Sequence, residues 1–272
     1  MKNIYKFYLL FLSFSLLCTP AEYRKSDPVR LANEKRIEEL NRNLRNIRFL
    51  LKHFRIAEAK KILSSTLSEV DSISWNPLSV EAYYTVGLVY FEEKDYFAAL
   101  NLFFKSLEFA KKEQMKENIA RIFNSIALIY CEDKKIDDAL ILLDEAYKNA
   151  TYAETKLSIQ NAKALCFRLK KENKKAWTLL KKIVKTSNKK GLYEIEISAL
   201  LQLADIASEK DPVMALNLSC KAFDVAEFWD DDRGRLSALE KQIEFAGKAG
   251  NNDIKEKAQN ALSYLRKKLF KD

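Results

Sequence analysis

Few side chains in this 272-residue chain are suited to chemistry. The one histidine, His53, is flanked by Lys52 and Arg55, and no second histidine exists to share a metal ion with it. A favourable contact with a helix C-terminus, or plain exposure to solvent, explains a histidine at the end of a basic helix. We therefore assign His53 no catalytic or metal-binding role.

The acidic cluster at 230–232 has the residue type of a cation site. It lacks the glycine and the later glutamate of an EF-hand loop, and Arg233 and Arg235 follow it closely. Carboxylates are also favoured at helix N-termini, so we expect a loop and a helix start here. The sequence contains no glycine-rich phosphate loop, nucleophile elbow or paired metal motif. We accordingly predict no enzymatic activity, no cofactor and no bound metal.

Three cysteines, Cys131, Cys166 and Cys220, lie within apolar stretches of the chain. They are isolated and odd in number, unlike the closely spaced pairs of a disulfide framework or a zinc site. We expect small buried side chains at these positions. In an exported protein, a pairing stays open if two of them approach each other.

The N-terminus has the pattern of a bacterial export signal. Lys2 and Lys6 precede an apolar run from Phe7 to Leu17, which is shorter than the roughly 20 residues that a membrane span needs. We therefore place a signal peptide at 1–17. A buried first helix is the alternative, but this segment offers no polar face to water.

Two cleavage sites compete after this signal. The segment S-L-L-C ending at Cys18 resembles a bacterial lipobox, although Leu17 stands where a small residue is usual. Cleavage after Ala21 would instead release a secreted or periplasmic soluble protein. We favour the first site, which predicts an exported, membrane-anchored lipoprotein of the cell envelope with lipid on Cys18. Residues 18–34 then form a tether.

Six alanines recur through the rest of the chain, each at the start of an amphipathic stretch that follows a polar turn. A period of about 40 residues predicts a stacked array of helix pairs, because one pair cannot bury its apolar faces alone. Only five glycines and four prolines are present, which agrees with long helices joined by short turns. The alanines are Ala59, Ala99, Ala139, Ala176, Ala215 and Ala258.

The third unit of the array shows this plan clearly. Phe123, Ile126, Ala127 and Tyr130 fall at i, i+3, i+4 and i+7, which forms one apolar helix face. A polar run follows, and a second apolar face then begins at Ala139. The pattern predicts two antiparallel helices in each unit.

The second unit follows the same plan, with Tyr83 and Gly87 on its first helix and Ala99 and Phe103 on its second. Gly87 is expected to meet the alanine and let the helices approach closely. This order of aromatic, small residue, alanine and phenylalanine resembles the tetratricopeptide repeat family. The resemblance implies an all-α, right-handed superhelical solenoid of about six antiparallel helix pairs over 35–272, whose first helices line a concave groove for a partner peptide or helix.

The concave groove is the candidate partner-binding surface. Asn124 and Asn161 occupy equivalent positions in it, where an amide can pair with a peptide backbone. The alternative is that such residues simply face solvent. The residues expected to face the groove are Tyr84, Leu88, Phe91, Arg121, Asn124, Leu128, Asn161, Arg168, Leu201 and Asp205.

Positive charge is concentrated in one segment, 163–190, which holds eleven basic residues and one acidic residue, Glu172. A basic stripe of this kind suits an acidic protein surface or membrane headgroups. Export argues against nucleic acid as the partner. A solvated lysine-rich helix pair is the alternative.

Together these patterns predict a non-catalytic protein-interaction scaffold or adaptor of the bacterial cell envelope. Lipidated repeat proteins of similar length serve β-barrel assembly and type IV pilus biogenesis, and the chain resembles that class. Its partners would be proteins, and a lipid anchor would hold it on the membrane. One alternative is a small-ligand binding or transport accessory lipoprotein with an enclosed apolar cavity. Another is a cytoplasmic regulatory repeat protein, which requires the leader to be a first helix.

Overall fold

The computed structural model describes residues 28–72 and 77–270, which are helical with short turns and contain no strand. The expectations for the signal peptide and for Cys18 lie outside these residues. The helices follow in the order α2 (Pro28–Lys52), α3 (Ile56–Lys61), α4 (Leu63–Ser72), α5 (Pro77–Glu92), α6 (Tyr96–Lys112), α7 (Lys116–Glu132), α8 (Ile136–Asn149), α9 (Ala153–Leu169), α10 (Asn173–Lys190), α11 (Tyr193–Ala207), α12 (Pro212–Phe228), α13 (Asp232–Lys248) and α14 (Asn252–Leu269).

The described helices form six consecutive pairs, which confirms the predicted all-α repeat fold. In the first pair, α2 packs against two short helices, α3 and α4; in each later pair, two long helices pack on each other. Helix α2 begins at Pro28. Residues 28–34, predicted to belong to a tether, are therefore helical. None of the described helices combines the length and the apolar character that crossing a membrane requires.

The six periodic alanines are all buried, at or near the start of the second helix of each pair. They allow that helix to lie against its neighbours, as the sequence predicts. Gly87 also makes room for an aromatic ring, because a Cβ there would come within 2.6 Å of Cε1 in the Phe103 ring. Phe103 is fully buried. The glycine therefore allows the close contact between α5 and this part of α6.

Side-chain caps mark several helix starts. Asp211 accepts a hydrogen bond from the Met214 backbone N–H, with Pro212 as the first helical residue. Asn251 caps α14 in the same way, since its side chain accepts a hydrogen bond from the Ile254 N–H. Gly250 adopts the left-handed conformation directly before this cap (φ 69°).

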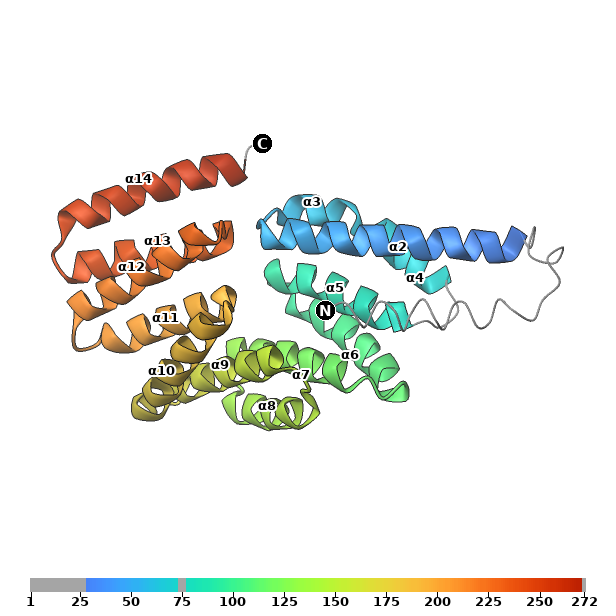
Figure 1. Ribbon diagram of the computed structural model, residues 1–272, viewed down its shortest axis with the longest axis horizontal. Helices are drawn as coiled ribbons and strands as arrows, with labels where there is room; N and C mark the ends of the chain where they lie inside the picture. The colour runs from blue at the N-terminus through green and yellow to red at the C-terminus, as the bar shows by residue number, and fades with distance from the viewer. Residues whose placement is uncertain (1–27, 73–76, 271–272) are drawn as a thin grey trace.

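The first helices of successive pairs also contact one another, in the order α2, α5, α7, α9, α11 and α13. They form an inner layer, and the array curves so that α13 and α14 return toward α2 and α3 (Figure 1). Phe54, which follows α2, stacks edge-on against Phe270 with ring centroids 5.8 Å apart. The two ends of the array therefore meet, and the inner layer surrounds a concave space.

Candidate functional site

A hollow of about 590 Å³ lies on the inner side of the array, between α2 and α5 on one side and α11 and α13 on the other. Only first helices, with the residue that caps α13, contribute to its wall. Its apolar surface comes mainly from Leu51, Leu88, Ile197 and Leu201. Seven of its fifteen lining residues are charged, which differs from the enclosed apolar cavity of the small-ligand alternative. These charged residues are Arg48, Lys52, Glu92, Glu194, Asp205, Asp231 and Arg233.

Ion pairs and aromatic contacts close the hollow where the ends of the array meet. Arg233 Nη2 lies 2.7 Å from Glu92 Oε1, which joins α13 to α5. Lys52 Nζ stands 5.8 Å from the ring centroid of Tyr193, and a hydrogen bond with that tyrosine raises the pKa of the lysine. These contacts connect residues more than 140 positions apart, so the wall of the hollow depends on the curvature of the whole array.

His53 and the acidic cluster also lie at this closure. His53 Nδ1 is 3.9 Å from Asp232 Oδ2 and its side chain is only 26% exposed, so plain exposure does not describe it. The cluster forms the start of α13, as predicted, and Arg235 pairs with Asp230 and Asp232. Arg233 turns instead toward α5. Among the described residues, no group of three or more ligating side chains is placed to hold a metal ion.

The carboxylate of Glu194 lies in the hollow near that of Asp231. Desolvation by the surrounding wall raises the pKa of Glu194, and the nearby charge of Asp231 raises it further. Asp231 is itself buried, at the residue that precedes α13. Glu194 therefore takes up a proton more readily than an ordinary glutamate does. A cationic group entering the hollow would relieve this repulsion.

Three of the predicted groove residues line the hollow, namely Leu88, Leu201 and Asp205. Asp205 is already paired within the array, because Lys241 Nζ lies 2.6 Å from Oδ1 and Arg168 Nη1 lies 3.5 Å from Oδ2. Arg168, also predicted, thus supports Asp205 from α9. The structure brings these four residues to one region of the inner layer.

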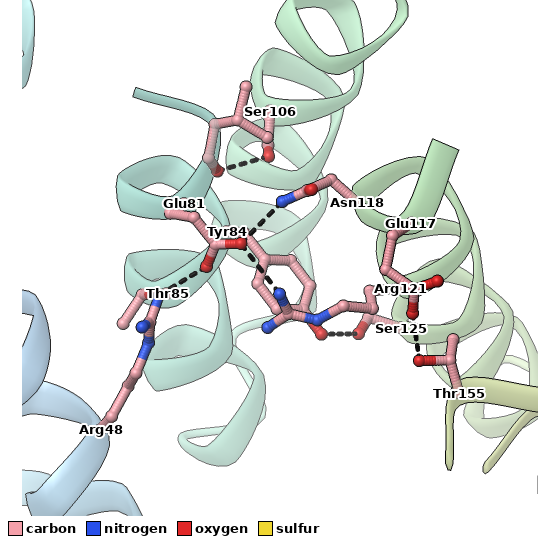
Figure 2. Close-up of polar contacts among 11 residues, drawn as sticks. Arg48, Glu81, Tyr84, Thr85, Ser106, Glu117, Asn118, Arg121, Ser125 and Thr155 are labelled. Carbon is pink, nitrogen blue, oxygen red and sulfur yellow. Dashed lines mark hydrogen bonds and ion pairs between the residues drawn. The ribbon is translucent and has the colours of Figure 1, made fainter. Parts of the chain in front are cut away.

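Tyr84 and Arg121 are used inside the array, and the expectation that Tyr84 faces the groove is wrong. Its side chain is only 8% exposed and its hydroxyl lies 3.1 Å from Ser125 Oγ. Arg121 covers the Tyr84 ring at 4.7 Å and donates to Glu81 at 2.8 Å (Figure 2). Arg48 donates to the same carboxylate from the other side, at 2.5 Å. Glu81 therefore joins the first three pairs.

The two predicted amides also bond within the inner layer. Asn161 donates to Ser198 Oγ at 2.8 Å and accepts from Gln202 Nε2 at 3.0 Å. Asn124 donates to Ser158 Oγ at 3.4 Å. Each amide thus connects its helix to the first helix of the next pair. The buried oxygens Asn124 Oδ1 and Gln202 Oε1 have no hydrogen-bond partner among the described residues.

The remaining predicted residues, Phe91 and Leu128, do not line the hollow. Phe91 packs near Tyr96 at the turn between α5 and α6, with ring centroids 5.9 Å apart. Leu128 is half-buried against the cluster formed by α7, α8 and α9. Both positions fall on the first helices, as expected, but their side chains are turned toward neighbouring helices.

The sequence interpretation missed the part of the hollow contributed by the first and last pairs. Arg48 and Lys52 come from α2, and Arg233 and Ser237 come from α13. These two helix pairs match the repeat pattern weakly, so the pattern does not indicate which of their residues face the inner side. Helical spacing could have found each side of the wall, but not the meeting of the two ends of the array.

The basic segment falls mainly on α10, a second helix. Lys163, Lys170 and Lys175 pair with acidic neighbours. Six other lysines on α10 are exposed, and within the described part of the chain no ion pair involves them. They are Lys174, Lys181, Lys182, Lys185, Lys189 and Lys190.

Comparisons with known proteins agree with this architecture. Residues 78–151 match the tetratricopeptide repeat family model, which covers α5 to α8, the two pairs with the clearest pattern. No curated protein sequence matches the chain.

Solved structures with the same fold cover most of the chain at low identity. A Rap conjugation gene regulator of plasmid pLS20 in complex with the Phr* peptide is 14% identical, with a TM-score of 0.70, over 98% of this chain and 74% of that chain. A Rap protein complexed with Competence and Sporulation Factor is 15% identical, with a TM-score of 0.61, over 85% and 78%. Pseudomonas aeruginosa pilF is 19% identical, with a TM-score of 0.50, over 87% and 94%. The chain is therefore an all-α helical repeat protein whose residues 78–151 match the tetratricopeptide repeat family model.

Proposed function

We propose that this protein is a non-catalytic interaction adaptor that binds a peptide or helix of a partner protein in the central hollow. The observation that carries the proposal is the hollow itself, a space of about 590 Å³ on the concave side, with a wall built by four of the six first helices. Two proteins of similar fold, described above, are in complex with the Phr* peptide and with Competence and Sporulation Factor, respectively. A repeat array of this kind presents its inner layer as an extended binding surface.

The lining of the hollow suits a peptide with both apolar and polar groups. Leu88 and Leu201 offer apolar contacts from opposite sides. Ser198 and Gln202 also line the hollow and add polar groups to its wall. The charged residues that line the hollow would select the partner by its charge pattern.

The unpaired lysines of α10 provide a second contact with an acidic face of the partner. They lie on a second helix, outside the inner layer. Their charges would increase the rate of association with an acidic protein, and salt would weaken that effect. The hollow would thus determine which partner binds, and the lysines of α10 would attract that partner.

The proposed adaptor is exported and carries lipid on Cys18. The pattern of 1–17 followed by Cys18 supports a lipoprotein anchored in the cell envelope, where a helical scaffold would recruit its partner to the membrane face. Palmitate labelling of cells that express the wild type or Cys18→Ala tests this step. Label on the wild type alone is expected, and equal labelling or none on both would contradict lipidation of Cys18.

Site-specific photo-crosslinking tests the binding surface. Benzoylphenylalanine is placed at Leu88 or Ser237, on opposite walls of the hollow, and at the exposed Phe104 of α6 as a matched control outside it. The same partner segment is expected from both hollow positions and not from Phe104. A synthetic peptide of that segment should bind the purified protein. Crosslinks from Phe104 alone would contradict binding in the hollow.

A further inference from the structure

Two of the cysteines expected to be isolated lie in direct contact. Cys131 is on α7 and Cys166 is on α9, and their Sγ atoms are 3.3 Å apart. Cys131 is 5% exposed and Cys166 is fully buried. They lie 35 residues apart, on the first helices of neighbouring pairs, so their approach is produced by the stacking of the repeats.

The surroundings of the two sulfurs hold them face to face. Both belong to one buried cluster with Ala127, Ala139 and Ala162. These small side chains leave room for the two sulfurs between the helices. The sulfurs need to approach by roughly 1.2 Å to reach the length of an S–S bond, about 2.05 Å. A movement of this size is within the reach of small side-chain rotations.

We propose that Cys131 and Cys166 form a disulfide that links α7 to α9 when the chain is exposed to a disulfide oxidant. One thiolate attacks the oxidant's disulfide, forms a mixed disulfide and releases one thiol. The second thiolate attacks the protein sulfur of the mixed disulfide and releases the other thiol. Two protein thiols thus lose two electrons and two protons, and one oxidant disulfide becomes two thiols.

The local chemistry favours this exchange once the sulfurs are reached. A hydrogen bond from the Cys131 thiol lowers the pKa of Cys166, and Lys163 acts in the same direction. A larger fraction of thiolate at Cys166 makes it the more effective nucleophile. Because both sulfurs are covered, the oxidant reaches them during folding or through a local opening of the helices.

The cross-link would stabilise the inner layer at its centre. It encloses the whole of α8 in a covalent loop and fixes the contact between α7 and α9, the helices that carry Asn124 and Asn161. Closing a loop of this length reduces the conformational freedom of the unfolded chain. Neither cysteine lines the hollow, so bond formation does not depend on partner binding.

Peptide mapping of the full-length protein tests the proposal. Reduced protein is incubated with oxidised glutathione, both folded and during refolding from denaturant, then alkylated in denaturant and digested. A linked peptide containing Cys131 and Cys166 is expected as the main product, with Cys220 alkylated as the internal control. Alkylation of both Cys131 and Cys166 in both arms, or pairing of either with Cys18 or Cys220 instead of with each other, would overturn the proposal.

Thermal unfolding gives an independent readout. Oxidised wild type is expected to melt at a temperature roughly 5 °C or more above reduced wild type. Cys131→Ala with Cys166→Ala should show no difference between oxidising and reducing buffers, whereas Cys220→Ala should keep the wild-type shift. A linked peptide without any rise in melting temperature would contradict the stabilising role. An equal shift in the double variant would assign the effect to another group.

Discussion

Glu92 and Arg233 form an ion pair of 2.7 Å that joins the second helix pair to the last one. The glutamate is largely covered and the arginine is half exposed. Together with the Phe54–Phe270 contact, the pair brings the ends of the array together beside the hollow. The shape of the candidate site therefore depends on a contact between residues far apart in the sequence.

Removing this pair is expected to loosen the closure without unfolding the array. A double-mutant cycle with Glu92→Gln and Arg233→Gln should give a coupling of at most about 1 kcal/mol, because the arginine remains open to water. Hydrogen exchange should become faster at the start of α13. The exposed pair Asp253–Lys257 within α14 is the control, and its neutralisation should leave exchange in α13 unchanged.

Unchanged exchange at α13 in the double variant would contradict a role for the pair in closure. Faster exchange across all helices would indicate global destabilisation instead. Circular dichroism distinguishes opening from unfolding, because only opening leaves the helix content intact.

Two glycine substitutions should have opposite effects. Gly87→Ala places a Cβ 2.6 Å from the buried Phe103 ring, and such overpacking destabilises by about 1–3 kcal/mol. Gly247→Ala meets only the mobile end of Lys255, at 3.9 Å, so the gain in helix propensity should stabilise by up to about 1 kcal/mol. Urea unfolding measures both. An equal change in the free energy of unfolding for both variants would show that the close contact with Phe103 does not destabilise the protein.

Glu117 is expected to make stability depend on pH. Burial opposes its ionisation, but hydrogen bonds from Thr151, Thr155 and the Tyr152 N–H outweigh it, and its pKa is lowered. A lowered pKa in the folded state means that the contribution is complete above the unfolded value, about 4.5, and is lost as the pH falls through the folded value. Glu117 also supplies the N-terminus of α9 with acceptors that Tyr152, its N-cap, lacks.

Glu117→Gln should accordingly cost on the order of 1 kcal/mol at neutral pH. The difference from wild type should shrink below about pH 4, where the carboxylate of the wild type becomes protonated. The exposed Glu108→Gln is the matched control, with no such dependence expected. A difference that stays constant from pH 7 to pH 3 would contradict this role.

The two predicted amides should differ in their structural importance. Asn161→Ala removes contacts of 2.8 Å and 3.0 Å to Ser198 and Gln202, and should cost about 1–2 kcal/mol in unfolding free energy. Asn124→Ala removes one contact of 3.4 Å and should cost less than about 1 kcal/mol. Urea unfolding measures both losses. A larger loss for Asn124→Ala than for Asn161→Ala would show that these hydrogen bonds do not determine how much each amide contributes to stability.

The repeat period sufficed to predict the all-α fold and the six pairs, because each periodic alanine marks a place where helices must approach. Helical spacing also placed Leu88, Leu201 and Asp205 correctly on the inner layer. It failed for Tyr84, since an aromatic ring at that position is pulled into the contact between α5 and α7. Spacing within one repeat also carries no information on how far the array curves. Helical spacing could therefore not predict that Glu92 pairs with Arg233 or that Cys131 contacts Cys166.

The most direct test of the central claim is the affinity of the crosslinked partner peptide for Ser237→Trp, measured by calorimetry. Ser237 lines the hollow, and an indole ring there would fill part of it. Ser64→Trp, on the exposed side of α4, is the matched control. We predict that Ser237→Trp weakens binding at least about tenfold, or 1.4 kcal/mol, and that Ser64→Trp binds as wild type. Equal affinity of all three proteins would contradict partner binding in the hollow.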